Sequence, residues 1–446
     1  MREALPIGLE YLIHPLTAAE FVERYWEQRW LHVRRQDRDH YAGFFDFADM
    51  DRIIAHGELQ ADYTLTLIKG DVAIHKLGHS GRQDYRGGHN LQQASLSPDG
   101  IYREVAEGST VRVSFTERYS QPVWELAGEL ERQLNANIIT NVFLTPAGSR
   151  AFSTHFDAHD VFILQLEGHK TWEVFEPPAD LPMEKPVRVR PELFTHRLPF
   201  DGRASLSAAK GQVPTEIRLE RGDFLYVPRG FSHRAWAGDD ELSMHLTVEI
   251  RAFTWHELFA HAIVRHLPHD VALRRGLPPG FATDPGRVEE AVGRRDELAA
   301  AVKAALAPER LAAAVEDLAN RYVHSRNPVS RGQLADVAQA ARIDTRTRLR
   351  VRPGVTARLA SHADTGGKLV LLFSGAALEL PERARSMVEL MLARRAFTVG
   401  ELPTGLGDES RLVLARHLLK SGFLALEPAE TAVPATINAQ TAGVKS

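Results

Sequence analysis

The sequence contains no cysteine among its 446 residues, which excludes disulfides, thiolate catalysis and cysteine-bound zinc. Any metal must therefore be held by histidine, aspartate or glutamate. The sequence also lacks a run of about 18 apolar residues and a signal-peptide pattern, so we expect a cytoplasmic protein without a membrane span. An excess of positive charge is missing too: the formal net charge of -4 gives no general attraction for nucleic acid.

The composition is that of a globular protein, with 44% hydrophobic and 25% charged residues. Short strands follow one another from residue 138 to residue 250, broken by a proline-rich stretch at 177–214. This order predicts an all-β core with a long insertion. We therefore expect an α+β protein whose first domain, residues 1–253, is built around a β-barrel.

After Arg251 the pattern becomes helical. Alanine-rich amphipathic segments predict a helical region over residues 254–328, whose apolar faces need burial, and we expect it to dimerise. Residues 329–428 return to mixed structure, and the order helix, short helix, helix and final strand is typical of a winged-helix-like domain. The tail at 429–446 has too little apolar content to pack, so we expect it to be disordered.

The stretch HFDAHDVFILQLEGHKTW, residues 155–172, reads as a buried β-hairpin yet begins with polar and ionisable residues. In a strand, residues two apart share a face, so His155 and Asp157 can direct an imidazole and a carboxylate toward one point. The pattern His-x-Asp/Glu is weak by itself, because it also occurs at His56 and His362. Its context decides whether it is a metal site.

A second segment, RGDFLYVPRGFSH at 221–233, supplies that context. Its G-D-x(4)-P-x-G-x(2)-H pattern is the signature of the cupin, or double-stranded β-helix, fold. In that fold His233 faces the His-x-Asp pair across the barrel. His155, Asp157 and His233 then form a two-histidine, one-carboxylate triad, which leaves three coordination positions open and favours non-haem Fe(II).

Lys170 lies just past the turn at Gly168 and alternates with Trp172 and Val174, so we expect it to point into the same barrel. A buried ammonium needs an anion, and no carboxylate nearby in the sequence is an obvious partner. A dicarboxylate cosubstrate, with 2-oxoglutarate the natural candidate, would chelate the metal at one end and meet Lys170 at the other. The alternative is a lysine that reaches solvent at a strand end.

Two long segments carry a family resemblance. TNVFLTPAGSRAFSTHFDAHDVFILQLEGHKTWEVFEP and RGDFLYVPRGFSHRA resemble the JmjC-type ribosomal oxygenases, the cupin-4 group of 2-oxoglutarate-dependent protein hydroxylases. The N-terminal FVERYWEQRWLHVRR also fits the family pattern, so the motifs cover residues 20–250. The order of JmjC barrel, helical dimerisation region and winged helix is similar to the family's layout.

The resemblance implies the site residues and the chemistry. His155, Asp157 and His233 would be the iron ligands and the catalytic centre, and Lys170 the cosubstrate anchor. Asn141 would help to line the cosubstrate pocket, whereas Phe143 departs from the hydroxylated aromatic frequent in the family. The cofactors implied are Fe(II), 2-oxoglutarate and O2, which together hydroxylate an unactivated C–H bond.

Three functions stay open at this point. The leading one is hydroxylation of a side chain of a protein, plausibly a ribosomal protein, by a homodimer. The second is tailoring of a small biosynthetic peptide, and the third is a non-catalytic metal-binding cupin that serves as an interaction module. Substrate choice is expected in the loops around 80–100 and 177–214. Membrane contact and sequence-specific DNA binding are not expected.

Three further features of the sequence could have a functional role or an ordinary structural one. His159 has the parity of the triad but lies beyond it, so we interpret it as a pocket residue at most. His245 lies inside a barrel strand and is either a satisfied core histidine or part of the pocket. Alternating arginines at 346–352 form either a solvated strand face or a basic stripe for RNA or an acidic protein.

Overall fold

The computed structural model describes residues 7–56, 64–70, 72–73, 97–178, 180–183, 211–271, 273–326, 332–361, 368–403 and 407–427. The chain divides into two compact units, residues 1–306 and 307–446. Most of the two loops expected to choose the substrate, and the whole tail at 429–446, lie outside the described residues. No helix among the described residues is long and apolar enough to cross a membrane.

The first unit contains two antiparallel sheets. The larger has the strand order β1 (Leu31–Val33), β9 (Phe224–Val227), β6 (Asp160–Glu167), β11 (Ser243–Arg251), β5 (Asn137–Thr145), β4 (Thr110–Ser114), β2 (Leu65–Lys69) and β3 (Val72–Ala73). The smaller has the order β10 (His233–Ala237), β7 (His169–Val174) and β8 (Thr215–Glu220). An apolar cluster from β6, β9, β7 and β8 joins the two sheets. The described part of the unit is the β-barrel that the sequence predicts.

The hairpin between β6 and β7 depends on glycine. Gly168 has a φ of 59°, a left-handed conformation that other residues adopt at a cost. A Cβ atom there would lie 2.2 Å from the main-chain oxygen of Leu242. After this turn the chain continues as β7, the central strand of the smaller sheet. Lys170 lies on this strand.

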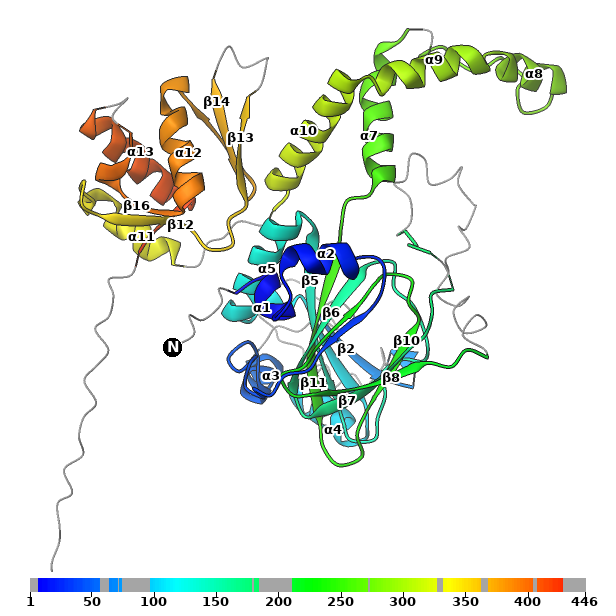
Figure 1. The fold of residues 1–446 in the computed structure, drawn as a ribbon, viewed down its shortest axis with the longest axis vertical. Coiled ribbons are helices and arrows are strands. Elements are labelled where there is room, and N and C mark those ends of the chain that lie inside the picture. Colours follow the sequence, from blue (N-terminus) through cyan, green and yellow to red (C-terminus); the bar gives the residue numbers. More distant parts are fainter. Residues whose placement is uncertain are drawn as a thin grey trace, which may run out of the picture. The chain divides into compact units, whose positions relative to one another are not determined.

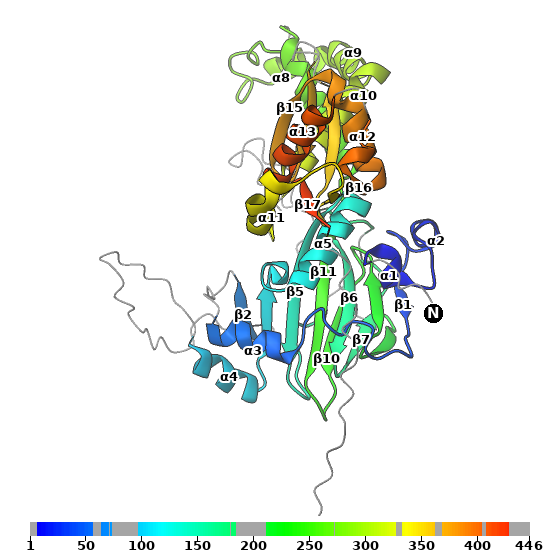
Figure 2. The same ribbon diagram turned by 90° about the vertical axis from the view of Figure 1, so that its left-hand side faces the viewer.

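The first unit contains α1 (Leu9–Ile13), α2 (Ala18–Arg24), α3 (Phe47–His56), α4 (Pro98–Ala106), α5 (Gln121–Leu134), α7 (Trp255–His266), α8 (Pro285–Gly293) and α9 (Arg295–Ala305). Some of these helices pack on the large sheet, α5 against β5 among them, whereas α7, α8 and α9 extend away from it (Figures 1 and 2). Phe21 of α2 is fully buried, with its ring centroid 5.0 Å from that of Tyr226 and 5.9 Å from that of Phe162. The N-terminal motif therefore fastens α2 to the barrel.

The long loop predicted over residues 80–100 ends earlier than expected. The side chain of Ser97 accepts a hydrogen bond from the main-chain N–H of Gly100 at 3.2 Å, and Pro98 occupies the first turn of α4. Both are ordinary features of a helix start. The last residues of this polar stretch therefore belong to a helix, while residues 80–96 lie outside the described part of the chain.

The second unit contains α10 (Pro308–His324), α11 (Gln333–Gln339), α12 (Arg385–Arg394) and α13 (Asp408–Lys420). One three-stranded sheet has the order β16 (Ala396–Thr398), β12 (Arg348–Val351) and β17 (Leu424–Leu426). The other has the order β13 (Ala357–Ser361), β14 (Leu369–Phe373) and β15 (Ala376–Leu380). From α12 to β17 the order is α12, strand β16, a single 3-10 turn at Val399–Glu401, α13 and β17, so a short strand stands where the expected succession of helix, short helix, helix and strand has none. The predicted helical region 254–328 is shared between the units, because α10 belongs to the second.

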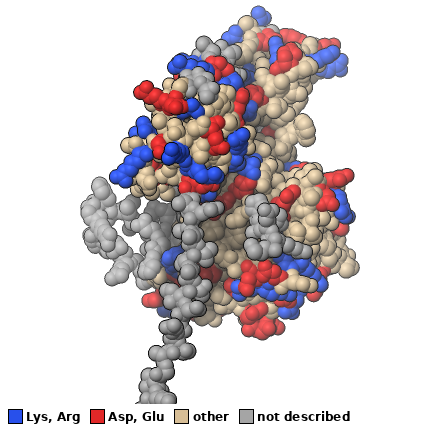
Figure 3. Space-filling model, turned by 60° about the vertical axis from the view of Figure 1, so that its left-hand side comes forward, with Lys and Arg blue, Asp and Glu red and all other residues tan. Residues whose placement is uncertain are grey.

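The arginines at 346–352 are not a uniform solvated face. Arg352 is buried and its guanidinium forms an ion pair with Asp336, while Arg348 forms an ion pair with Glu427. Basic and acidic side chains are also interspersed on the face drawn in Figure 3. The buried Arg352 therefore serves the fold, whereas Arg348 is 62% exposed and its ion pair lies at the surface.

Candidate active site

The structure brings together the three residues expected to bind metal. One ligand atom each from His155, Asp157 and His233 lies within 4.8 Å of the other two. The two imidazole centroids are 4.6 Å apart, and Nε2 of His233 is 3.7 Å from Oδ2 of Asp157. These atoms converge on one point, as a single ion requires.

The hydrogen bonds of both histidines leave the correct nitrogen free for a metal. Nδ1 of His155 lies 2.8 Å from the main-chain oxygen of Ser153, and Nδ1 of His233 lies 3.1 Å from that of Phe231. A carbonyl oxygen can only accept, so each Nδ1 carries the proton and each Nε2 keeps its lone pair. The donor set, two neutral imidazoles and one carboxylate, suits Fe(II).

Electrostatics favour the metal-binding protonation states. Burial first, and the neighbouring His155 second, lower the pKa of His233 to about 4, so the imidazole is neutral at pH 7. Burial by itself would raise the pKa of Asp157, but His159, His155 and His233 more than offset it and hold that pKa below its usual value. His233 is therefore a neutral metal donor beside the carboxylate anion of Asp157.

The metal segment is not a regular strand, in contrast to the sequence-based expectation. His155 forms an isolated bridge with His233: each main-chain N–H donates to the other's carbonyl, at 3.1 and 2.7 Å. Asp157 lies beyond that bridge, and its carbonyl accepts from the N–H of Gly230 at 2.9 Å. Three backbone hydrogen bonds thus hold the ligands in register without a continuous ladder.

Lys170 lies at the closed end of the same cavity. It is 2% exposed, and its Nζ donates to Oγ1 of Thr145 at 2.9 Å. It forms no ion pair with any acidic group among the described residues. Burial lowers its pKa from 10.5 to about 7. The ammonium form is therefore only partly populated near pH 7, and an external anion in the cavity would stabilise it.

Other polar atoms at this end are also unpaired. Nε1 of Trp172 and Nδ1 of His245 are buried and have no hydrogen-bond partner among the described residues, and both side chains line the cavity. The indole N–H can only donate. Burial, with the charge of Lys170 second, lowers the pKa of His245 far below 6.5, so that histidine is neutral. Together these groups fit a carboxylate of a cosubstrate such as 2-oxoglutarate.

Asn141 and Phe143 lie on β5 and line the cavity, as expected. The side-chain nitrogen of Asn141 donates to Oε1 of Glu249 at 2.7 Å. The Phe143 ring stacks on His245 with a centroid separation of 5.1 Å and an interplanar angle of 2°. Phe143 therefore offers an apolar wall where a hydroxylated aromatic would offer a donor.

Several cavity residues were missed from the sequence. The cavity has a volume of about 240 Å³, and its walls include Arg112, Trp172, Thr247 and Glu249. His159, interpreted from sequence as a pocket residue, lines it too, with Nε2 at 3.5 Å from Oε2 of Glu249 and 4.0 Å from Oδ1 of Asp157. Inward alternation along β11 was the available signal for Glu249.

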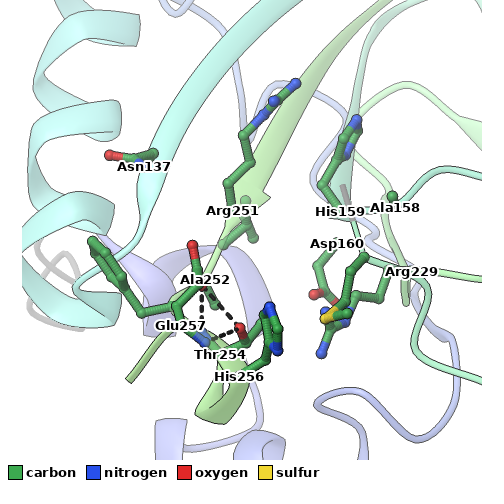
Figure 4. A pocket seen from close by; sticks show the side chains of 13 residues that line it. Asn137, Ala158, His159, Asp160, Arg229, Arg251, Ala252, Thr254, His256 and Glu257 are labelled. Carbon is green, nitrogen blue, oxygen red and sulfur yellow. Dashed lines mark hydrogen bonds between the residues drawn. The ribbon is translucent and has the colours of Figure 1, made fainter. Parts of the chain in front are cut away.

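A second cavity of about 270 Å³ lies beside the first, and His159 lines both. Figure 4 shows its walls, with Arg251 and His159 pointing toward the same side and Thr254 and Glu257 joined at the start of α7. Arg229 also contributes, but its guanidinium forms an ion pair with Glu27 at 2.6 Å.

Residues 114–258 match the family model of the JmjC domain. This stretch contains the barrel strands of the site and all three residues of the triad, and it is therefore similar to a JmjC domain. The chain is similar to ribosomal oxygenases. It is 28% identical over 387 residues to ribosomal oxygenase 1 of Danio rerio, covering 80% of this chain and 66% of that protein. The resemblance inferred from the sequence motifs is confirmed.

Two other relatives are also similar to this chain. Ribosomal oxygenase 1 of Homo sapiens is 32% identical over 280 residues, covering 61% of this chain and 39% of that protein. The bifunctional lysine-specific demethylase and histidyl-hydroxylase NO66 of Aedes aegypti is 27% identical over 341 residues. The match covers 73% of this chain and 50% of that protein. The chain thus spans between about two fifths and two thirds of the length of these relatives.

A solved structure is also similar. The Escherichia coli ribosomal oxygenase YcfD in complex with cobalt and 2-oxoglutarate is 18% identical, with a TM-score of 0.48, over 93% of this chain and 99% of that one.

Proposed function

We propose that this protein is an Fe(II)- and 2-oxoglutarate-dependent oxygenase that hydroxylates a side chain of a ribosomal protein. One observation carries the proposal: a metal-binding triad and a buried lysine without an acidic partner among the described residues face the same cavity. The names of the relatives add the substrate class, since they act as ribosomal oxygenases or as a histidyl-hydroxylase. A ribosomal substrate also favours a cytoplasmic location.

In this proposal His155, Asp157 and His233 hold the metal on one face and leave the other face open. The ammonium of Lys170 binds the far carboxylate of the cosubstrate, and Asn141 lines the pocket between them. When bound, Fe(II), 2-oxoglutarate and O2 supply the oxidation, in which the cosubstrate is decarboxylated to succinate and one oxygen atom enters a C–H bond. The buried walls orient the reactants and exclude water.

The test of this function is intact-mass spectrometry of ribosomal proteins from cells that lack the gene. They are incubated with the purified protein, Fe(II), 2-oxoglutarate and air. A gain of one oxygen on a single ribosomal protein, absent when 2-oxoglutarate is omitted, supports the proposal. Succinate release without any such gain would move the search to other peptides, and no succinate with any peptide pool would contradict the oxygenase itself.

Cosubstrate binding is expected to weaken at alkaline pH. The pKa of Lys170 is about 7 in the free protein, and a dicarboxylate binds the protonated form, so binding takes up a proton above that pH. The dissociation constant for 2-oxoglutarate should rise by about tenfold per pH unit above pH 7. Calorimetric titration with Mn(II) in place of Fe(II) measures it. A Lys170→Arg variant, which stays charged, should show a flat profile, and a flat profile in the wild type would contradict this role.

The dimer and the two C-terminal domains are further parts of the proposal. Exposed apolar side chains gather on α7, where Trp255 and Phe259 are 86% and 47% exposed and one helical turn apart. We place the dimerisation region at 254–328 and the winged-helix-like domain at 329–428. The sheet β16-β12-β17 with α11, α12 and α13 supports the latter.

A double variant tests the dimer. Trp255→Glu with Phe259→Glu should convert a dimer to a monomer, because a glutamate cannot be buried without a partner. Light scattering measures the mass. Val413→Glu, at a position 59% exposed on α13, is the matched control and should stay dimeric. A monomeric wild-type protein would show that the apolar face has another use.

A further inference from the structure

The inward face of β6 continues beyond the start of that strand, toward the metal-binding triad. Asp157, His159 and Val161 alternate along the chain, and all three line the metal cavity. Val161 lies in β6 and is paired with Glu249 of β11. His159 directly precedes β6, so it stands at the junction between a regular strand and the irregular segment that carries Asp157.

The two oxygens of the Asp157 carboxylate face different histidines. Oδ2 lies 3.7 Å from Nε2 of His233, on the side of the triad, whereas Oδ1 lies 4.0 Å from Nε2 of His159. No donor among the described residues hydrogen-bonds to either oxygen. His159 is therefore the group placed to act on the oxygen that faces away from the triad.

The His159 ring is held on its other side by Glu249, since its Nε2 lies 3.5 Å from Oε2 of that residue. Glu249 is fixed in turn, because its Oε1 accepts from Asn141 at 2.7 Å and its Oε2 accepts from Arg251 at 2.9 Å. The oxygens of both carboxylates can only accept, so Nε2 carries the proton. One N–H thus lies between a fixed carboxylate and the metal-binding carboxylate of Asp157.

The second nitrogen of the ring argues against a role in packing alone. Nδ1 of His159 is buried and has no hydrogen-bond partner among the described residues. The side chain is 13% exposed and lines both cavities. A buried nitrogen without a partner is costly, and an apolar residue would fill the same space without that cost. The histidine is therefore explained by its other nitrogen, Nε2.

The number of oxygens that Asp157 gives to a metal decides how many coordination positions stay open. When each side chain of the triad gives one atom, three positions remain, two for the chelating end of 2-oxoglutarate and one for O2. A carboxylate can also bind a metal through both oxygens, which would occupy the last of these positions. Groups that contact a metal ligand from outside commonly set its orientation.

We infer that His159 is a positioning residue: its Nε2–H holds Oδ1 of Asp157 away from the metal, so that Asp157 binds through Oδ2 alone and one position stays open for O2. This inference rests on the proposed function and adds a residue to it. His159 acts through Asp157 and not on a reactant. The requirement is a donor at the place of Nε2, and not a histidine as such.

Three variants separate that requirement from the shape of the side chain. In His159→Gln the amide nitrogen can occupy the place of Nε2, whereas in His159→Asn it reaches only the place of Nδ1. His159→Leu removes the donor altogether. The matched control is His256→Leu, because His256 is exposed and lines the second cavity but not the metal cavity.

Nitric oxide is the probe, because it binds an open position on Fe(II) without turnover. The full-length protein is loaded with Fe(II) and saturating 2-oxoglutarate in the absence of air, and electron paramagnetic resonance follows the nitric oxide titration. Its dissociation constant should rise by about tenfold or more in His159→Leu and His159→Asn, and stay within about threefold of the wild type in His159→Gln and His256→Leu. A prior Fe(II) titration of each variant sets the metal concentration for full occupancy.

Equal nitric oxide binding in His159→Leu and the wild type would overturn the inference. A loss in His159→Gln as large as that in His159→Asn would also overturn it, because a donor at the place of Nε2 would then be without effect. The proposed function fails differently. Ribosomal proteins left unmodified by the wild type, with the expected nitric oxide pattern, would refute that function and keep the role of His159.

Hydroxylation of a ribosomal protein by the wild type, with equal nitric oxide binding in all variants, would keep the function and refute the role of His159.

Discussion

Replacement of Asp157 by alanine is expected to lower the rate of hydroxylation by at least about 10³-fold, the largest effect of any single change. Loss of groups that only orient metal ligands costs about 10- to 100-fold, and Asp157 would be a ligand itself. Its carboxylate is also the one anion of the triad, so Fe(II) affinity should fall together with turnover. Succinate release and metal titration measure the two effects.

The variant should still fold. The hydrogen bonds of Asp157 that set the backbone involve its carbonyl, and both histidines keep their own Nδ1 partners. Thermal unfolding of the metal-free protein should therefore change little. Asp296→Ala, at an aspartate that is 89% exposed in α9, is the matched control and should keep full activity. Retention of turnover in Asp157→Ala would exclude the proposed centre.

Lys170→Met is expected to weaken 2-oxoglutarate binding by about 100-fold or more, because removing one partner of a buried ion pair leaves the other charge unpaired. Fe(II) binding should persist because, within the described ranges, the hydrogen bond of the Lys170 ammonium is with Thr145 and not with a residue of the triad. Calorimetric titration with Mn(II), and then with 2-oxoglutarate, measures metal binding and cosubstrate binding separately. Lys368→Met is the control, because that lysine is 60% exposed and pairs with Glu379. Unchanged cosubstrate affinity in Lys170→Met would rule out the anchor.

The same variant should stabilise the protein in the absence of cosubstrate. Wild-type Lys170 buries an ammonium without an anion, so methionine should raise the free energy of unfolding by about 1–4 kcal/mol at pH 7. Because the folded pKa is about 7 and the unfolded pKa is 10.5, the unfolded state binds more protons between these values. The advantage should therefore shrink as pH rises through that window. Urea unfolding at pH 7 and pH 9 checks the sign.

Local patterns predicted much of the fold. The glycine after β6, the alternation of Lys170 with Trp172, and the pattern from Gly222 to His233 all depend on residues close in the chain, so their geometry follows from turn and strand periods. The end of the polar loop was misjudged, because Ser97 and Pro98 start a helix whose stability depends on burial of Ile101 in the core.

The site was harder to predict where partners are distant in sequence. Thr145 meets Lys170 across 25 residues, and Asn141 meets Glu249 across 108, so neither contact has a local signature. Arg352 looked like part of a surface stripe, but its partner Asp336 lies in α11. Such contacts follow from strand register and packing, which one sequence does not display.

The alternation along β11 places the two ends of the cavity on one strand. His245 is 2% exposed and lies close enough to Lys170 for that charge to lower its pKa, whereas the side chain of Glu249, further along the strand, is 18% exposed. One continuous ladder with β5 holds both positions, so their separation is set by the extended backbone. A shift of register along β11 would therefore displace the buried end and the exposed end of the cavity together.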